Sequence, residues 1–162
     1  MLGSGPEAMP PFALHPTLAR DTREVVRLPL CRVLLMKDRR FPWLILVPER
    51  EPAREIHELA PADRAALIEE IALAGEVLTR LFRPDKLNVG ALGNIVPQLH
   101  VHVVARSAAD PAWPGPVWGS GVALPYAEGE LEELRDRLAA AFQETVENKG
   151  RKGQQGRKGQ KG

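Results

Sequence analysis

The chain has 162 residues, a length that suits one domain with a hydrophobic core of its own. Its 44% hydrophobic and 27% charged residues are typical of a soluble globular protein. It lacks the ~18 consecutive apolar residues of a membrane span and the features of a secretory signal, so we expect a cytoplasmic protein with no membrane partner. The single cysteine, Cys31, excludes an internal disulfide and lies in an apolar run that predicts burial.

The net charge of +1 conceals an uneven distribution of charge along the chain. Six of the 22 basic residues lie from Lys149 onward, where no acidic residue occurs, so the rest of the chain is mildly acidic. Because this end repeats Gly-Arg-Lys-Gly-Gln and has no apolar residue to bury, we predict a disordered basic tail over residues 145–162. Residues 149–162 form either a solvated appendage or a weak, salt-sensitive contact for RNA or another polyanion.

Between a flexible arm at residues 1–12 and this tail, we expect one domain over residues 13–144. Its first half contains two apolar runs, 30–37 and 43–47, separated by a short polar segment that predicts a hairpin. Helical periodicity follows from Pro61 to Phe82, with proline at the first helical position and again after the end.

The second half begins with a strand over residues 86–92 and a turn at Gly93-Asn94. A strand over 98–104 and a loop rich in proline and tryptophan, residues 111–119, come next. An amphipathic helix over roughly 129–143 completes the domain. This order of elements predicts an α+β fold with an antiparallel sheet.

The run 98–104 alternates polar and apolar side chains. Alternate residues of a strand point to opposite faces, so its apolar members should face the core. Its polar members should then share the other surface: Gln98, His100 and His102.

Two interpretations of this strand involve no catalysis by histidine. The histidines could simply be surface residues of a half-exposed strand, without a functional role. They could also bind a metal, since His-x-His on a strand supplies two imidazole ligands. No carboxylate follows before Asp110, and His15 or His57 could complete such a site only through long-range folding. We therefore expect neither a metal nor a cofactor.

The third interpretation is nucleophilic catalysis on phosphorus. A neutral imidazole is an available nucleophile at pH 7, and His100 occupies the middle of the array. Gln98 and His102 could bond the phosphoryl oxygens, and the Gly93-Asn94 turn could add further donors. Arg106 is expected either to contribute positive potential or to be solvated at the end of the strand.

Residues 85–104 resemble the signature strand of the histidine triad (HIT) superfamily, whose members carry His-φ-His-φ-His-φ-φ with φ apolar. Residues 41–48 and 113–119 are similar to a bacterial branch of that superfamily, and the resemblance covers most of 13–144. It implies a compact α+β domain with an antiparallel sheet of about five strands and flanking helices. It also implies a homodimer whose sheets join across the interface.

The resemblance further implies a nucleotide phosphohydrolase or nucleotidyl transferase that acts at the α-phosphate. The middle triad histidine, which forms a nucleotidyl-enzyme intermediate, falls on His100, and the third falls on His102. The Gly-Gln pair that precedes the triad in many members falls on Gly93 and Asn94. Asn88 lies near a polar position that the family has on the preceding strand.

Gln98 and Asp38 are among the positions that depart from the family pattern. Gln98 stands at the first triad position, and an amide cannot gain a proton near neutral pH. Asp38 lies where many members place an asparagine that contacts ribose, and it could take the ribose hydroxyls instead. The alternative function is therefore a non-catalytic nucleotide- or RNA-binding protein that keeps the pocket and uses the basic tail as a second contact.

The tryptophans also have more than one interpretation. Trp113 and Trp118 could close over a base or leaving group, pack across a dimer interface, or simply pack against the core. Trp43, at the start of an apolar strand, is expected in the core.

Overall fold

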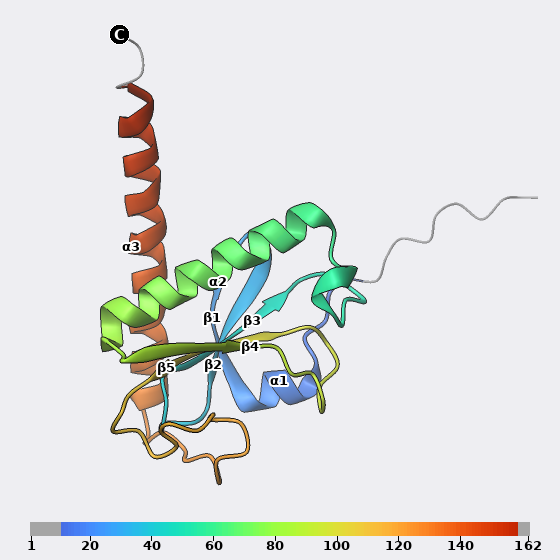
Figure 1. Cartoon of the computed structure of the whole chain (residues 1–162), viewed down its shortest axis with the longest axis vertical. Coiled ribbons are helices and arrows are strands. Elements are labelled where there is room, and N and C mark those ends of the chain that lie inside the picture. Colours follow the sequence, from blue (N-terminus) through green and yellow to red (C-terminus); the bar gives the residue numbers. More distant parts are fainter. Residues whose placement is uncertain (1–10, 159–162) are drawn as a thin grey trace, which may run out of the picture.

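One five-stranded antiparallel sheet organises the chain in the computed structural model, which describes the backbone of residues 11–158 and side chains as far as Gly153. The strand order is β1-β2-β3-β5-β4. Helices α2 and α3 cover one face of the sheet, and α1 and long loops cover the other (Figure 1). This is the expected α+β fold.

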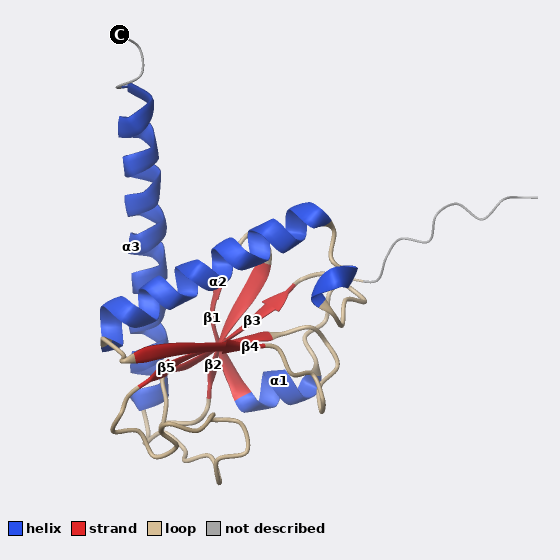
Figure 2. Ribbon diagram, viewed as in Figure 1, coloured by secondary structure: helices blue, strands red, loops and turns tan. Residues whose placement is uncertain are grey.

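The elements follow the chain in a simple order, which Figure 2 shows by type. Three of them lie close to the positions that the sequence patterns predict: the two strands of the hairpin and the first long helix. Their bounds are α1 (Pro16–Asp21), β1 (Thr22–Arg27), β2 (Cys31–Met36), β3 (Trp43–Pro48), the 3-10 turn η1 (Ile56–Glu58), α2 (Pro61–Phe82), β4 (Lys86–Gly90), β5 (Val101–Arg106) and α3 (Glu130–Lys158).

Strand β1, like helix α1 before it, is an element that the apolar pattern does not reveal. Its sequence, TREVVR, is mostly polar, and its ladder with β2 is interrupted by an irregularity between Glu24 and Val26. An edge strand with few buried side chains leaves little alternation to detect.

Helix α2 is fixed to the sheet at two points. The buried carboxylate of Glu70 accepts hydrogen bonds from the backbone N–H groups of Leu30 and Cys31, each at 2.8 Å. Gly75 lets the helix approach β4, since a Cβ there would lie 3.0 Å from the Leu87 side chain. Cys31 is fully buried, and burial raises the pKa of its thiol, so it is not a reactive residue.

Helix α3 continues well beyond the boundary that the sequence pattern indicates. Leu138, Ala141 and Phe142 anchor its first half in the core, whereas the described side chains from Val146 onward are exposed. The helix nevertheless extends to Lys158, through most of the tail for which we expected disorder. Residues 1–10 of the expected arm and 159–162 lie outside the described part of the chain.

In the described part of the chain, no helix is both long enough and apolar enough to cross a bilayer.

Strand register sorts the side chains into two cores. Leu44 pairs with Val103, and both face the helices, where aliphatic residues from the sheet, α2 and α3 form the larger core. Ile45 pairs with His102, and both face the opposite side, where Phe41 and two tryptophans join a smaller core. The histidines therefore lie on the face that the long helices leave uncovered.

Candidate active site

His100 and His102 lie side by side on this second face. Each histidine is 7% exposed, and their ring centroids are 5.0 Å apart. Val101 and Val103 between and after them point into the helix-side core, as the alternation predicts. His102 thus projects from the central strand β5, and His100 lies directly before its first residue.

A cavity of about 580 Å³ opens in front of both histidines. Its walls come from α1, the hairpin, the turn that precedes β5, and the tryptophan-containing loop. The residues that matter most for its chemistry are Asp38, Arg40, Trp43, Gly93, Asn94, His100, His102 and Trp118. This size and mixed lining suit a small organic ligand with a polar end.

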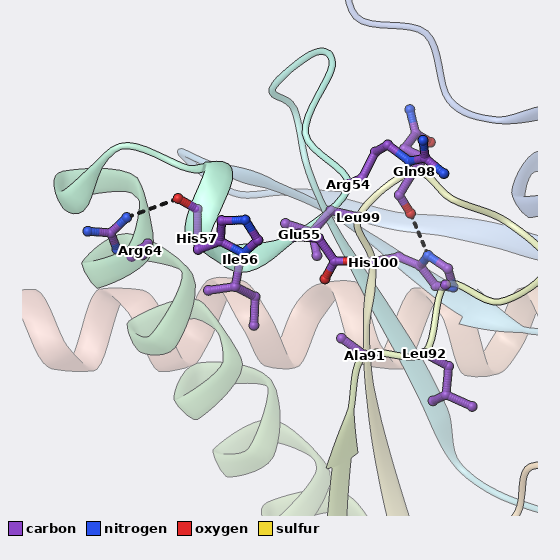
Figure 3. A pocket seen from close by; sticks show the side chains of 11 residues that line it. Arg54, Glu55, Ile56, His57, Arg64, Ala91, Leu92, Gln98, Leu99 and His100 are labelled. Carbon is purple, nitrogen blue, oxygen red and sulfur yellow. Dashed lines mark hydrogen bonds between the residues drawn. The ribbon is translucent and has the colours of Figure 1, made fainter.

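The hydrogen bond of His100 determines which of its nitrogens carries the proton. Nδ1 lies 2.6 Å from the backbone carbonyl oxygen of Gln98 (Figure 3). A carbonyl has no hydrogen to give, so Nδ1–H must be the donor, and neutral His100 keeps its lone pair on Nε2. Nε2 of His100 has no hydrogen-bond partner among the described residues. It is also not fully buried, so it is accessible from the cavity.

His102 has a different environment. Trp43 Nε1–H donates to His102 Nδ1 at 2.9 Å, and the two rings are 5.7 Å apart. Burial, with a smaller contribution from charge on His100, lowers the pKa of His102 to about 4. His102 is therefore neutral at physiological pH.

The turn at Gly93 and Asn94 lines the same cavity as the two histidines. Gly93 has φ +70°, a conformation that side-chain-bearing residues rarely adopt, so glycine suits this turn. Asn94 is exposed, which leaves its amide available to a ligand.

Gln98 does not join the histidines on their surface. Its side-chain amide donates to the Ala13 carbonyl and to Glu51, both at 2.8 Å, and its oxygen accepts from the backbone of His15. The β5 ladder begins only at Val101, so strand alternation does not control the Gln98 side chain. Gln98 instead ties the segment before α1 to the strand that carries His100.

Asp38 lines the cavity but already has strong partners. Its carboxylate, 1% exposed, pairs with Arg40 at 2.7 Å and accepts from the backbone of Leu124. Burial acts to raise the pKa of Asp38, but the hydrogen bonds from Arg40 and the backbone outweigh it and hold this pKa below its ordinary value. The carboxylate is therefore ionised, with Arg40 beside it at the cavity wall.

Asn88 shares the histidine face of the sheet without lining the cavity. Its side-chain oxygen accepts from Arg106 at 2.7 Å. The structure therefore places Asn88 in the support for Arg106 and not among the residues that face a ligand.

Arg106 is neither solvated nor a source of potential at the strand end, because it is 1% exposed. It pairs with Asp110 through two bonds and donates to the Gly115 carbonyl, and its guanidinium lies over the Phe41 and Trp113 rings. These contacts hold the loop that ends in Trp118. Trp113 therefore packs on Arg106, away from the cavity lining.

Trp118 lies edge-on to His102, with ring centroids 5.5 Å apart. Gly90, which pairs with His102, makes room for it, since a Cβ there would be 3.1 Å from the Trp118 ring. Among the described residues, Trp118 Nε1 is the one buried side-chain nitrogen or oxygen without a partner. The ring thus acts as a wall of the cavity.

A second cavity, of about 560 Å³, lies between η1, the start of α2 and the chain before β5 (Figure 3). Arg54 and Arg64 bring positive charge to its lining and Glu55 brings negative charge, and Arg64 also donates to the backbone carbonyls of His57 and Leu59. His100 borders this cavity as well as the first.

Residues 11–153 contain no group of three His, Cys, Asp or Glu side chains that could hold a metal ion. His15 does not line the cavity, and its Nδ1 accepts from the Thr17 backbone at the start of α1. His57 belongs to the second cavity.

Sequence reasoning missed the two most important neighbours of the predicted residues. Trp43 was expected only in the core, and Arg40 was not singled out. Alternation along residues 43–47 could have placed Trp43 and Ile45 on one face. The pairing of β3 with β5 brings Trp43 beside His102, and the local sequence pattern does not predict this pairing.

The HIT domain model matches residues 18–109, which is more than half of the chain and includes both histidines. The chain belongs to the HIT domain family. This family generally comprises nucleotide-binding hydrolases and transferases, and some of its members are not catalytic.

Solved structures of histidine triad proteins are similar over nearly their whole length. The protein from Bradyrhizobium japonicum is 43% identical, with 82% of this chain and 99% of that chain covered and a TM-score of 0.79. The protein from Sinorhizobium meliloti is 48% identical, with coverage of 80% and 96% and a TM-score of 0.78. The protein from Marinobacter aquaeolei is 43% identical, with coverage of 84% and 99% and a TM-score of 0.80.

None of the curated proteins compared with the chain matches it significantly.

Proposed function

We propose that this HIT protein is a nucleotide hydrolase or nucleotidyl transferase that acts at the α-phosphate, with His100 as the nucleophile. One observation carries the proposal: Nδ1 of His100 is held by the Gln98 carbonyl, so the lone pair on Nε2 is directed at an open cavity. A fixed imidazole lone pair beside hydrogen-bond donors is what nucleophilic attack on phosphorus requires.

The reaction divides into two displacements at phosphorus. Nε2 of His100 forms a bond to the α-phosphorus while the bond from phosphorus to the leaving group breaks, and the leaving group departs with the electron pair. Water or another acceptor then attacks phosphorus and releases its proton to the solvent, and the electron pair of the N–P bond returns to Nε2. His102 and the amides at Gly93-Asn94 would stabilise the phosphoryl oxygens where negative charge accumulates.

The remaining predicted residues have supporting roles in this proposal. Gln98 acts through its backbone carbonyl, which orients His100, since its side-chain N–H groups are already used. Arg40, held in place by Asp38, would meet the ribose at the cavity wall. The apolar surfaces of Ile45 and Trp118 suit the base.

The test compares the wild-type protein with His100→Ala on an adenosine phosphoramidate and on a dinucleoside polyphosphate. Loss of the nucleophile should reduce turnover roughly a thousandfold or more. His57→Ala is the matched control, because it removes an exposed histidine outside the main cavity. Mass spectrometry of wild-type protein quenched in alkali should also locate a nucleotidyl group on His100.

Equal turnover by the wild type and His100→Ala would remove His100 from the mechanism. Binding of adenosine 5′-monophosphate with no product from either substrate would favour the alternative, a non-catalytic nucleotide-binding protein.

We also propose a homodimer formed through strand β4, which is at an edge of the sheet. Val89 on this strand is 52% exposed, and Ile68, two turns before Gly75 on the same face of α2, is 60% exposed. Sedimentation should give the mass of two chains, and Val89→Lys should shift it toward one. A single-chain mass for the wild type would overturn this proposal.

A further inference from the structure

Trp43 and His102 form a buried pair that brings β3 and β5 together behind the cavity. In the ladder Ile45 is opposite His102 and Trp43 is opposite Val104, so Trp43 and His102 are diagonal neighbours on one face. Both side chains are at most 7% exposed, and the bond between them is 2.9 Å long. Such a bond is worth more than one at the surface, because water does not compete for either partner.

The direction of this bond is unambiguous. An indole nitrogen only donates, so His102 Nδ1 must accept, and it cannot carry a hydrogen. A neutral imidazole then has its hydrogen on Nε2. Nε2 of His102 has no hydrogen-bond partner among the described residues. It is also not fully buried, so this N–H can donate to a ligand in the cavity.

The two histidines consequently differ in tautomer. His100 has hydrogen on Nδ1 and a lone pair on Nε2, whereas His102 has a lone pair on Nδ1 and hydrogen on Nε2. With the rings 5.0 Å apart, one phosphoryl group could meet the lone pair of the first and the N–H of the second. Two histidines in the same tautomer could not provide this combination.

We propose that Trp43 is a positioning residue, which holds His102 as an Nε2–H donor toward the phosphoryl group that His100 attacks. The role of this donor in turnover rests on the proposed function. The tautomer itself does not, because it follows from the bond. Burial of His102 acts in the same direction, since it opposes the doubly protonated ring that could not accept from Trp43.

Trp118 provides a matched control within the same site. Its ring is 5.5 Å from His102, close to the 5.7 Å of Trp43, but its indole N–H has no hydrogen-bond partner within the described part of the chain. Substitution of either tryptophan by phenylalanine removes similar volume beside the same imidazole. Only Trp43→Phe removes a hydrogen bond to it.

The experiment is nitrogen-15 NMR of the full chain with labelled histidine and tryptophan at neutral pH. Wild-type His102 should be protonated at Nε2 and His100 at Nδ1. Trp118→Phe should leave both tautomers unchanged, whereas Trp43→Phe should populate the Nδ1–H form of His102 about three- to tenfold more, the equilibrium change of one hydrogen bond. An Nδ1–H form of His102 in the wild type would overturn the inference even if Trp43→Phe failed to fold.

Turnover and nucleotide binding test whether the His102 tautomer matters for the reaction. Trp43→Phe should lower kcat on an adenosine phosphoramidate by about three- to tenfold and reduce the shift of the His102 Nε2–H signal on addition of adenosine 5′-monophosphate. A changed tautomer with unchanged turnover and unchanged nucleotide binding would overturn the positioning role. Absence of turnover in the wild type, with the expected tautomers and the expected nucleotide-induced shift, would contradict the proposed function alone.

Discussion

The two faces of the sheet use the same strands for different purposes. Toward α2 and α3 the strands contribute aliphatic side chains such as Leu44 and Val103, which stabilise the fold by close packing away from water and need no hydrogen-bond partner. Toward the cavity the same strands contribute Trp43, His102 and Arg106, whose buried polar groups each need a partner. Stability on the first face depends on packing, and function on the second depends on hydrogen bonds between distant residues.

The largest effect should come from loss of the buried arginine on the cavity face. Arg106→Met leaves Asp110 and Asn88 without their partner, so we expect a loss of about 3–5 kcal/mol in the free energy of unfolding, measured by urea denaturation. Arg50→Met is the control, since it breaks an exposed pair with Asp63 and should cost about 1 kcal/mol or less. Equal losses would mean that the Arg106 pairs contribute no more than surface pairs.

Leu44 and Ile45 are neighbours on β3 that point to opposite faces of the sheet, so their substitution tests the two faces separately. Leu44→Ala should lower the free energy of unfolding by about 2–5 kcal/mol and leave the turnover of the folded protein unchanged. Ile45→Ala should be similarly destabilising, but it should also reduce turnover, because Ile45 lines the cavity opposite His102. Equal turnover losses would show that the faces are not independent.

The neutral, buried His102 should make stability depend on pH. Because its folded pKa, about 4, is below the ordinary value of 6.5, the unfolded chain binds more protons between these values, and stability falls as pH falls from about 6.5 to about 4. This group should account for a loss of about 3 kcal/mol, which His102→Asn should abolish. Urea denaturation at several pH values measures the difference.

His57→Asn, at an exposed histidine, is the control for this measurement and should keep the slope of the wild type. A slope that persists in His102→Asn would assign the acid sensitivity to other groups.

The smallest effect should come from removal of residues 149–162. The described side chains of this segment are exposed, and the pair of Lys149 with Glu76 is half-exposed on both sides. Truncation after Asn148 should therefore change the free energy of unfolding by about 0.5 kcal/mol or less and leave turnover unchanged. We expect it to weaken salt-sensitive binding to a polyanion such as RNA, measured by electrophoretic shift at low salt.

Local sequence was sufficient for the elements whose signals are short-range. The helix over 61–82 has proline at its start, an apolar stripe and a stop signal at its end, and all of these act within a few turns. The alternation that predicts a shared surface for His100 and His102 requires only the period of a strand, and it holds as far as His100, one residue before β5. The same residues, with the HIT motif, also indicated the family.

Contacts between distant segments decided the rest. Gln98 bonds to residues 47 to 85 positions away, and Trp43 meets His102 across 59 positions, so no local pattern contains either partner. The sequence predicts that Arg106 either contributes positive potential or is solvated, because its burial depends on the loop that folds back over it. Sequence determined which side chains share a surface, whereas the fold determined their hydrogen-bond partners, because those bonds form only once strands and loops are packed together.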